Sequence, residues 1–453
     1  MPESRCLVSK PRNVQHEDAL GRTTPEATTI LRVCVAAILG ILLVLAAWRC
    51  SILGNPPPRI LPSEPPLDGR EGRPLALDQF RPRSMLKVAE HDVSRAKFPV
   101  IDMHTHPQVR LEKPVDVSQG ESKGESRRAV VSSDAVDAFV RLMDEQNIAV
   151  CVSLDGGLGT KLEDHQRLLW TKHRDRFAIL ANIDFKGRGQ QDQPATWDCN
   201  QPGFVERTVE QLRAAQASGI SGLKFFKEFG LGVRNADGSL ATIDDPKWDP
   251  IWEACGRLKL VVLIHTADPL AFFEPIDATN ERWEELRRHP DWSFHGPQWP
   301  KHADLLAALL RVVKKHRQTT FIAAHVANLP EDLSTVGRWL DENPNLHVEI
   351  AARIAELGRQ PFTAREFLVK YADRVMFGTD GPRTADRLKL HWRFFQTRDE
   401  YFPYAENEFP PQGFWRIYGV DLPDDVLRKV YYQNAVRLIP GVEERLRRVT
   451  AER

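Results

Sequence analysis

Short apolar runs alternate with amphipathic stretches along the chain from Phe98 onward. Such runs are typical of buried strands, whereas most of the stretches between them have the period of helices that bury one face. We predict strands over Val100–His104, Ala149–Leu154, Phe177–Ile183, Gly222–Phe226, Leu260–His265, Thr320–His325, Leu346–Ile350 and Arg374–Gly378. We predict helices over Ser133–Gln146, Phe204–Ser218, Trp248–Arg257, His302–His316 and Leu333–Asn343, with Ser133 or Asp134 capping the first. Alternating strands and helices predict an α/β fold with a parallel sheet, and eight strands favour the closed (β/α)8 TIM barrel.

The region before the barrel has a different composition. Residues 1–29 are polar and irregular, which predicts disorder. Residues 30–49 include an uncharged apolar run whose length is close to the ~17–25 residues of a transmembrane helix, with a cleaved secretory signal as the alternative. Residues 50–97 are rich in proline and predict a semi-rigid linker. We therefore expect a barrel over residues 98–445 that is membrane-anchored outside the cytoplasm, or secreted if the apolar segment is cleaved.

Charge and cysteine content argue against several classes of protein. The 62 basic and 62 acidic residues balance and form no basic stripe, so nucleic acid is not expected as a partner. The six cysteines are scattered without a Cys-x-x-Cys pair, which argues against a zinc knuckle or a disulfide framework. No Gly-x-Gly-x-x-Gly follows the first predicted strand, so the chain lacks the fingerprint of a dinucleotide site.

Histidines and an aspartate stand at the ends of four predicted strands. His104 and His106 are two residues apart at the end of the first strand, so their side chains point to the same face. His265, His325 and Asp380 end the fifth, sixth and eighth strands. In a TIM barrel the carboxyl ends of the strands form one face, and that face carries the active site. Imidazole and carboxylate groups gathered there predict a metal site that suits zinc, iron or manganese.

The order of these residues resembles the amidohydrolase superfamily, and most of all its amidohydrolase-related branch, which also contains aminocarboxymuconate-semialdehyde decarboxylase and related carboxy-lyases. The motifs that carry the resemblance are Ile-Asp-Met-His-Thr-His-Pro (101–107), Gly-Leu-Lys (222–224), Ile-His-Thr-Ala-Asp-Pro (264–269), Ala-Ala-His-Val (323–326) and Phe-Gly-Thr-Asp-Gly-Pro (377–382). These motifs are specific for the superfamily and the fold, but they give almost no information about the substrate. The resemblance covers about residues 98–440.

The resemblance implies one divalent metal ion, with zinc expected first and iron or manganese as alternatives. Its ligands would be the counterparts of His104, His106, His265 and Asp380, with His325 close to the metal. Three imidazoles and one carboxylate leave a position for water, whose pKa the ion lowers to ~7. We expect Asp380 to take the proton of this water and His325 to stabilise developing negative charge.

Five further residues are weaker candidates for binding substrate. Lys224 ends the fourth strand, where binuclear relatives carry a carboxylated lysine; we expect one metal, with Lys224 close to it. Arg353 follows the seventh strand and either binds a substrate carboxylate or pairs with a nearby glutamate. Asn280, Arg282 and His295 lie in a long connection rich in aromatic residues, which is either a lid over the site or an insertion packed on itself.

Two enzyme classes share this predicted ligand set. The first is a metal-dependent hydrolase that attacks an amide, ester or lactone carbonyl with water, and the alternative is a non-oxidative decarboxylase (carboxy-lyase). Both imply a small-molecule substrate, and a homo-oligomer is compatible with either. A tethered scaffold without activity would be expected to have lost metal ligands, and this chain keeps all of them.

Overall fold

The computed structural model describes residues 82–107, 131–381, 384–405 and 412–451, together with residues 70, 74–76, 79 and 80. The chain divides into two compact units, Met1–Arg83 and Ser84–Arg453, and every strand and helix named below belongs to the second. The predicted disordered segment and the apolar run at residues 30–49 lie outside the described residues. None of the helices in the described ranges is both long and apolar enough to cross a membrane. Residues 84–97, which the sequence pattern places in the linker, fall within the second unit.

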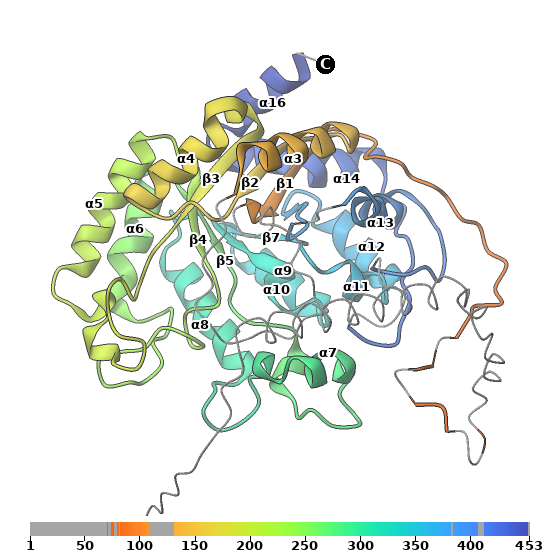
Figure 1. Cartoon of the computed structure of the whole chain (residues 1–453), viewed down its shortest axis with the longest axis horizontal. Helices are drawn as coiled ribbons and strands as arrows, with labels where there is room; N and C mark the ends of the chain where they lie inside the picture. Colours follow the sequence, from red (N-terminus) through yellow and green to blue (C-terminus); the bar gives the residue numbers. More distant parts are fainter. Residues whose placement is uncertain are drawn as a thin grey trace, which may run out of the picture. The chain divides into compact units, whose positions relative to one another are not determined.

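Eight parallel strands form the centre of this unit, and helices surround them (Figure 1). Their order in the sheet is their order in the sequence, which is the topology of a TIM barrel. The strands are β1 (Val100–Thr105), β2 (Ile148–Ser153), β3 (Phe177–Asn182), β4 (Gly222–Phe225), β5 (Val261–Ile264), β6 (Phe321–Ala323), β7 (Leu346–Glu349) and β8 (Val375–Met376). Each lies within or close to the range predicted from the apolar runs.

Hydrogen bonds between β1 and the chain that follows β8 bring the first and last strands together. The N–H of Met103 donates to the carbonyl oxygen of Phe377 over 3.0 Å, and the N–H of Asp380 donates to that of His104 over 2.9 Å. The buried Asp102 carboxylate accepts from the backbone N–H of Thr379 over 3.1 Å. These contacts place the end of β8 beside the end of β1, and the predicted (β/α)8 fold class is confirmed.

The five predicted helices are confirmed as α3 (Ser133–Glu145), α5 (Phe204–Ala217), α6 (Asp249–Arg257), α8 (His302–Lys315) and α10 (Leu333–Glu342). The cap of α3 was predicted one residue too late, because the Ser132 side chain accepts from the N–H of Ala135. The other α-helices are α4 (Thr160–His173), α7 (Trp283–Arg288), α11 (Ile354–Leu357), α12 (Pro361–Lys370), α13 (Ala385–Gln396), α14 (Asp424–Arg428), α15 (Asn434–Leu438) and α16 (Val442–Ala451). The segment labelled α9 (Ala324–Ala327) is a short turn that contains left-handed residues.

The apolar side chains form an inner and an outer layer. Alternation along β1 sends Ile101 and Met103 into the inner layer with Ile322 of β6, while Val100 packs with the surrounding helices. All four are fully buried. The barrel is therefore filled by side chains, and polar groups that point along its axis gather at the strand ends.

The long connection after β5 packs largely on itself. Phe272, Phe273, Leu286 and Phe294 form a separate apolar cluster together with Leu305 of α8. Of the two alternatives raised by the sequence, this packing supports an insertion with its own small core.

Candidate metal centre

Two histidine rings and one carboxylate meet where β1 and β8 end. The Nε2 atom of His104 lies 3.8 Å from Oδ1 of Asp380, and the Nε2 atom of His106 lies 3.7 Å from the same oxygen. Both histidines are buried, whereas 25% of the Asp380 side chain is exposed. Three of the predicted ligands therefore share one small space that solvent reaches from the carboxylate side.

Two further carboxylates fix the direction of these rings. Nδ1 of His104 donates to Oε1 of Glu349 over 2.9 Å, and Nδ1 of His106 donates to Oδ1 of Asp155 over 2.7 Å. With Nδ1 engaged in this way, the Nε2 lone pair of each ring is directed toward Asp380. Burial lowers the pKa of His104 well below its usual value, so this ring is neutral. Carboxylates placed behind histidines in this manner are typical of metal sites.

The spacing of the donor atoms fits one divalent ion. Nitrogen and oxygen ligands lie about 2.0–2.2 Å from zinc, so two atoms bound to the same ion are at most about 4.4 Å apart. The Nε2–Oδ1 distances of 3.7 and 3.8 Å lie within that limit and are too long for hydrogen bonds. Neutral imidazoles with one carboxylate form a donor set that zinc, iron and manganese share.

His325 lies in a left-handed turn directly after β6. The strand ends at Ala323, earlier than predicted, and the φ angles over 325–328 are 58°, 57°, 56° and 55°. The backbone N–H of His325 donates to Oε1 of Glu349 over 2.9 Å. Oδ1 of Asn328 accepts from the N–H of Thr266 over 3.1 Å, so both ends of the turn are held. Few residues other than glycine adopt this conformation, which is why an apolar run cannot predict it.

The ring of His325 stands between two other predicted site residues. Its centre lies 4.8 Å from that of His104 and 4.4 Å from that of His265. Its Nδ1 atom lies 2.8 Å from the carbonyl oxygen of Ala351, and because a carbonyl only accepts, Nδ1 carries the hydrogen. Burial lowers the pKa of His325 well below its usual value. The ring is therefore neutral, and its Nε2 atom is an acceptor.

His265 lies beside this group and is turned toward a different carboxylate. Its Nε2 atom is 3.5 Å from Oδ1 of Asp268, and Asp268 also pairs with Lys227. Burial lowers the pKa of His265, and Asp268 opposes that effect. The structure thus gathers His104, His106 and Asp380 tightly and places His265 next to them through its contact with His325.

Two buried cations border the site. Nζ of Lys224 has no hydrogen-bond partner among the described residues, and burial lowers its pKa to about 8. Arg353 is also buried; its Nη1 atom donates to the carbonyl oxygen of Ala352 over 2.9 Å, while its Nε atom has no partner in the described ranges. The charges of both cations act on Asp380. The predicted alternative, in which Arg353 pairs with a nearby glutamate, is not seen, because Arg353 forms no ion pair with a glutamate among the described residues.

The three candidates in the insertion mainly hold that insertion together. The Asn280 amide donates to two backbone carbonyls over 2.8 and 3.0 Å and accepts from the N–H of Arg282 over 2.9 Å. Arg282 is buried and pairs with Glu285 over 2.7 Å and with Glu356. His295 is exposed, and its Nδ1 atom lies 3.2 Å from a backbone carbonyl oxygen. The amide of Asn280 and the two Nη atoms of Arg282 are thus engaged within the protein, whereas Nε of Arg282 has no partner among the described residues.

Sequence reasoning missed Glu349 and Asp155 as part of the site. Glu349 ends β7 and Asp155 closely follows β2, so both stand where the other polar residues of the site stand. The sequence pattern could have indicated both residues, because each is an acidic residue at or after the end of an apolar run.

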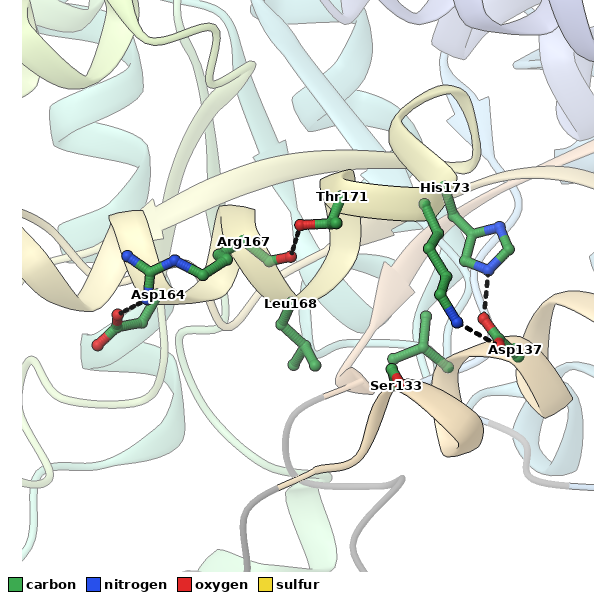
Figure 2. Close-up of a pocket in the computed structure, with 9 residues that line it drawn as sticks. Ser133, Asp137, Asp164, Arg167, Leu168, Thr171 and His173 are labelled. Carbon is green, nitrogen blue, oxygen red and sulfur yellow. Dashed lines mark hydrogen bonds and ion pairs between the residues drawn. The ribbon is translucent and has the colours of Figure 1, made fainter.

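A second hollow lies between α3 and α4 on the outside of the barrel (Figure 2). There Asp137 accepts from His173 Nε2 over 2.7 Å and from Lys172 Nζ over 2.9 Å. None of its lining residues stands at a strand end. The hollow is therefore separate from the candidate metal centre.

The sequence profile of the family described as Amidohydrolase matches residues 101–441, which span the barrel and all of the candidate site. The chain belongs to this family. The chain is accordingly an enzyme of the amidohydrolase superfamily, and that predicted resemblance is confirmed. No curated protein matches its sequence.

Three solved structures illustrate what the chain is similar to. A 2,6-dihydroxybenzoate decarboxylase from Rhizobium has 17% identity and a TM-score of 0.44, over 75% of this chain and 98% of that one. A 5-carboxyvanillate decarboxylase from Sphingomonas paucimobilis has 14% identity and a TM-score of 0.40, over 75% and 98%. A probable 2-pyrone-4,6-dicarboxylic acid hydrolase from Acinetobacter baumannii has 13% identity and a TM-score of 0.41, over 75% and 99%. Similarity at this level assigns no substrate.

Proposed function

We propose that this amidohydrolase is a metal-dependent hydrolase that opens an amide, ester or lactone bond of a small molecule. The observation that carries the proposal is the position of Asp380, whose carboxylate adjoins the Nε2 atoms of both His104 and His106 and is partly exposed. A carboxylate in this position is able to bind an ion and to accept a proton from a water molecule beside it.

Each residue then has a defined task. His104, His106, His265 and Asp380 would hold the ion, which when bound lowers the pKa of a water molecule to about 7 and polarises a carbonyl group. Asp380 accepts the proton of the attacking water and delivers it to the leaving group. Because Glu349 holds the ring of His104, that imidazole needs no reorientation during the reaction.

His325 has a different task from the one that the sequence suggests. We expected it to stabilise negative charge, but its Nδ1 hydrogen faces the carbonyl oxygen of Ala351 and its neutral Nε2 is an acceptor. His325 therefore accepts a hydrogen bond from the substrate. The groups left to stabilise negative charge are the two buried cations Lys224 and Arg353; with a pKa of about 8, Lys224 is mostly protonated at neutral pH.

The proposal is tested by following the oxygen of water into the product. The full chain, loaded with zinc or manganese, is incubated in ¹⁸O-water with representative esters, lactones and amides. We expect one ¹⁸O in the acid product and its loss in Asp380→Asn. Asp386→Asn is the matched control, because Asp386 is exposed on α13 and pairs with Lys389 of the same helix. No turnover above the Asp380→Asn background in all three bond classes would overturn the proposal.

A second candidate, a non-oxidative decarboxylase, is favoured by the two buried cations. Lys224 Nζ and Arg353 Nε lack hydrogen-bond partners in the described part of the chain, and a substrate carboxylate would satisfy both. In this reaction the carbon–carbon bond breaks, CO₂ leaves and a proton replaces it, so no oxygen from water enters. Release of CO₂ from aromatic acids without ¹⁸O incorporation, weakened by Arg353→Met, would select this candidate over hydrolysis.

The location of the enzyme is proposed from the sequence alone. We propose that residues 30–49 anchor the barrel outside the cytoplasm or direct its secretion. Mass spectrometry of the mature amino terminus distinguishes the two, since a start after this segment would exclude the anchor.

A further inference from the structure

A cavity of about 360 Å³ lies beside the candidate metal centre. Its walls come from four parts of the chain: the residues after β4, the end of β5, the insertion and α8. Phe226, Ile264, Trp299 and Leu305 represent these four parts, and all present apolar surface. Binding sites for small molecules are typically concave and apolar, with a few polar groups that fix orientation.

Two of the wall residues connect the cavity to the predicted ligands. His265, which is one of the four predicted metal ligands, forms part of the wall. Phe226 forms another part, and its ring stacks on that of His106 with centres 5.5 Å apart. The cavity therefore meets the surroundings of the candidate metal centre at these two rings, while His104, His106 and Asp380 do not line it.

One polar group in the wall lacks an intramolecular partner. Thr266 is only 6% exposed, and its Oγ1 atom has no hydrogen-bond partner among the described residues. Buried hydroxyl groups are nearly always hydrogen-bonded, so an unpaired one in a cavity wall is available to pair with a molecule bound there. The backbone N–H of Thr266 is bonded to Asn328, which fixes the residue in place.

We propose that this cavity binds the apolar body of the substrate, that this body is larger than a single six-membered ring, and that it carries a hydrogen-bonding group for Thr266. The size follows from comparison with dry apolar cavities, because one of about 150 Å³ already holds benzene. The proposal rests on the proposed function for the reacting end of the substrate. It adds the substrate class, an amphiphile with a fused-ring or branched apolar portion.

The test measures binding without turnover. Isothermal titration calorimetry on the full chain compares 2-naphthol, which has two fused rings and one hydroxyl group, with phenol. Ala308 lines the cavity from α8, so Ala308→Leu should fill part of it and weaken 2-naphthol binding at least tenfold. Ala303→Leu places the same side chain on the exposed face of α8 and should bind as the unaltered protein does. Thr266→Val, which keeps the shape and removes the hydroxyl, should weaken 2-naphthol at least threefold.

The outcomes separate the cavity from the chemistry. Tighter binding of 2-naphthol than phenol, lost in Ala308→Leu and reduced in Thr266→Val, supports the proposal even if no ester, lactone or amide is hydrolysed. Equal binding of the two phenols, or unchanged binding in Thr266→Val, overturns it. Thermal melting shows whether Ala308→Leu folds, and if it does not, Thr266→Val alone decides.

Discussion

Replacement of Glu349 by glutamine should weaken zinc binding about 10- to 100-fold, because this carboxylate orients a ligand from behind. Oε1 of Glu349 accepts from Nδ1 of His104 and from the N–H of His325, both over 2.9 Å, and Oε2 accepts from the N–H of Ala351. Glutamine offers one oxygen in place of two. At least one of the three donors therefore lacks an acceptor after the substitution.

The substitution should lower the free energy of unfolding as well as the affinity for zinc. The better orientation of the amide keeps its oxygen toward His104 and His325 and points its NH₂ group at the N–H of Ala351, so two donors face each other. A buried donor without a partner costs about 1–3 kcal/mol of folding free energy. The loss of 10- to 100-fold in zinc affinity corresponds to about 1.4–2.8 kcal/mol, since each tenfold is about 1.4 kcal/mol.

The assay is competition for zinc between the full chain and a chromophoric chelator. Glu342→Gln is the matched control: Glu342 is exposed, pairs with Lys314 over 3.1 Å and should leave zinc affinity unchanged. If Glu349→Gln and Glu342→Gln both bind zinc as tightly as the unaltered protein, Glu349 does not orient a metal ligand and the reasoning is refuted.

Three further predictions concern activity, packing and acid stability. Asp380→Asn should lower kcat/KM about 10²- to 10⁴-fold, since it removes the proton acceptor. Steady-state kinetics on protein of measured metal content would test this, and a loss below tenfold would contradict it. Ile322→Ala should lower the free energy of unfolding by about 2–5 kcal/mol, because Ile322 is fully buried inside the barrel; an unchanged urea midpoint would disprove it. Burial lowers the pKa of His391 from 6.5 to about 4, so the unfolded chain takes up this proton first and stability falls as pH drops from about 6.5 toward 4. His391→Gln should make that fall less steep in urea titrations at several pH values, and an identical slope would count against it.

Local patterns in the sequence predicted the barrel and much of the site. Each strand is a short apolar run buried on both faces, and such runs are legible without knowledge of their neighbours. Because the strands of a barrel end at one face, the position of His104, His106 and Asp380 at strand ends was sufficient to bring them together.

What the sequence could not predict depends on contacts across the fold. Glu349 holds the ring of His104 and the backbone of His325 at once, and only the arrangement of three strands reveals this. The tautomer of His325 is set by the backbone carbonyl of Ala351. Every residue has such a carbonyl, so the residue type at this position does not reveal the contact. Whether the connection after β5 covers the site or packs on itself was open for the same reason, because its aromatic residues suit both.

The left-handed turn after β6 has a consequence for how this protein tolerates mutation. Each residue other than glycine in such a conformation costs roughly 1–2 kcal/mol, a cost that glycine avoids. At Ala327, whose φ is 56°, glycine should therefore raise the free energy of unfolding, although the same change inside a regular helix lowers it. Selection for thermal stability alone would therefore favour glycine in this turn, with the backbone that carries the imidazole of His325 unchanged in conformation. A search for heat-resistant variants of this barrel should thus find glycine next to the site, at a position where most helices would reject it.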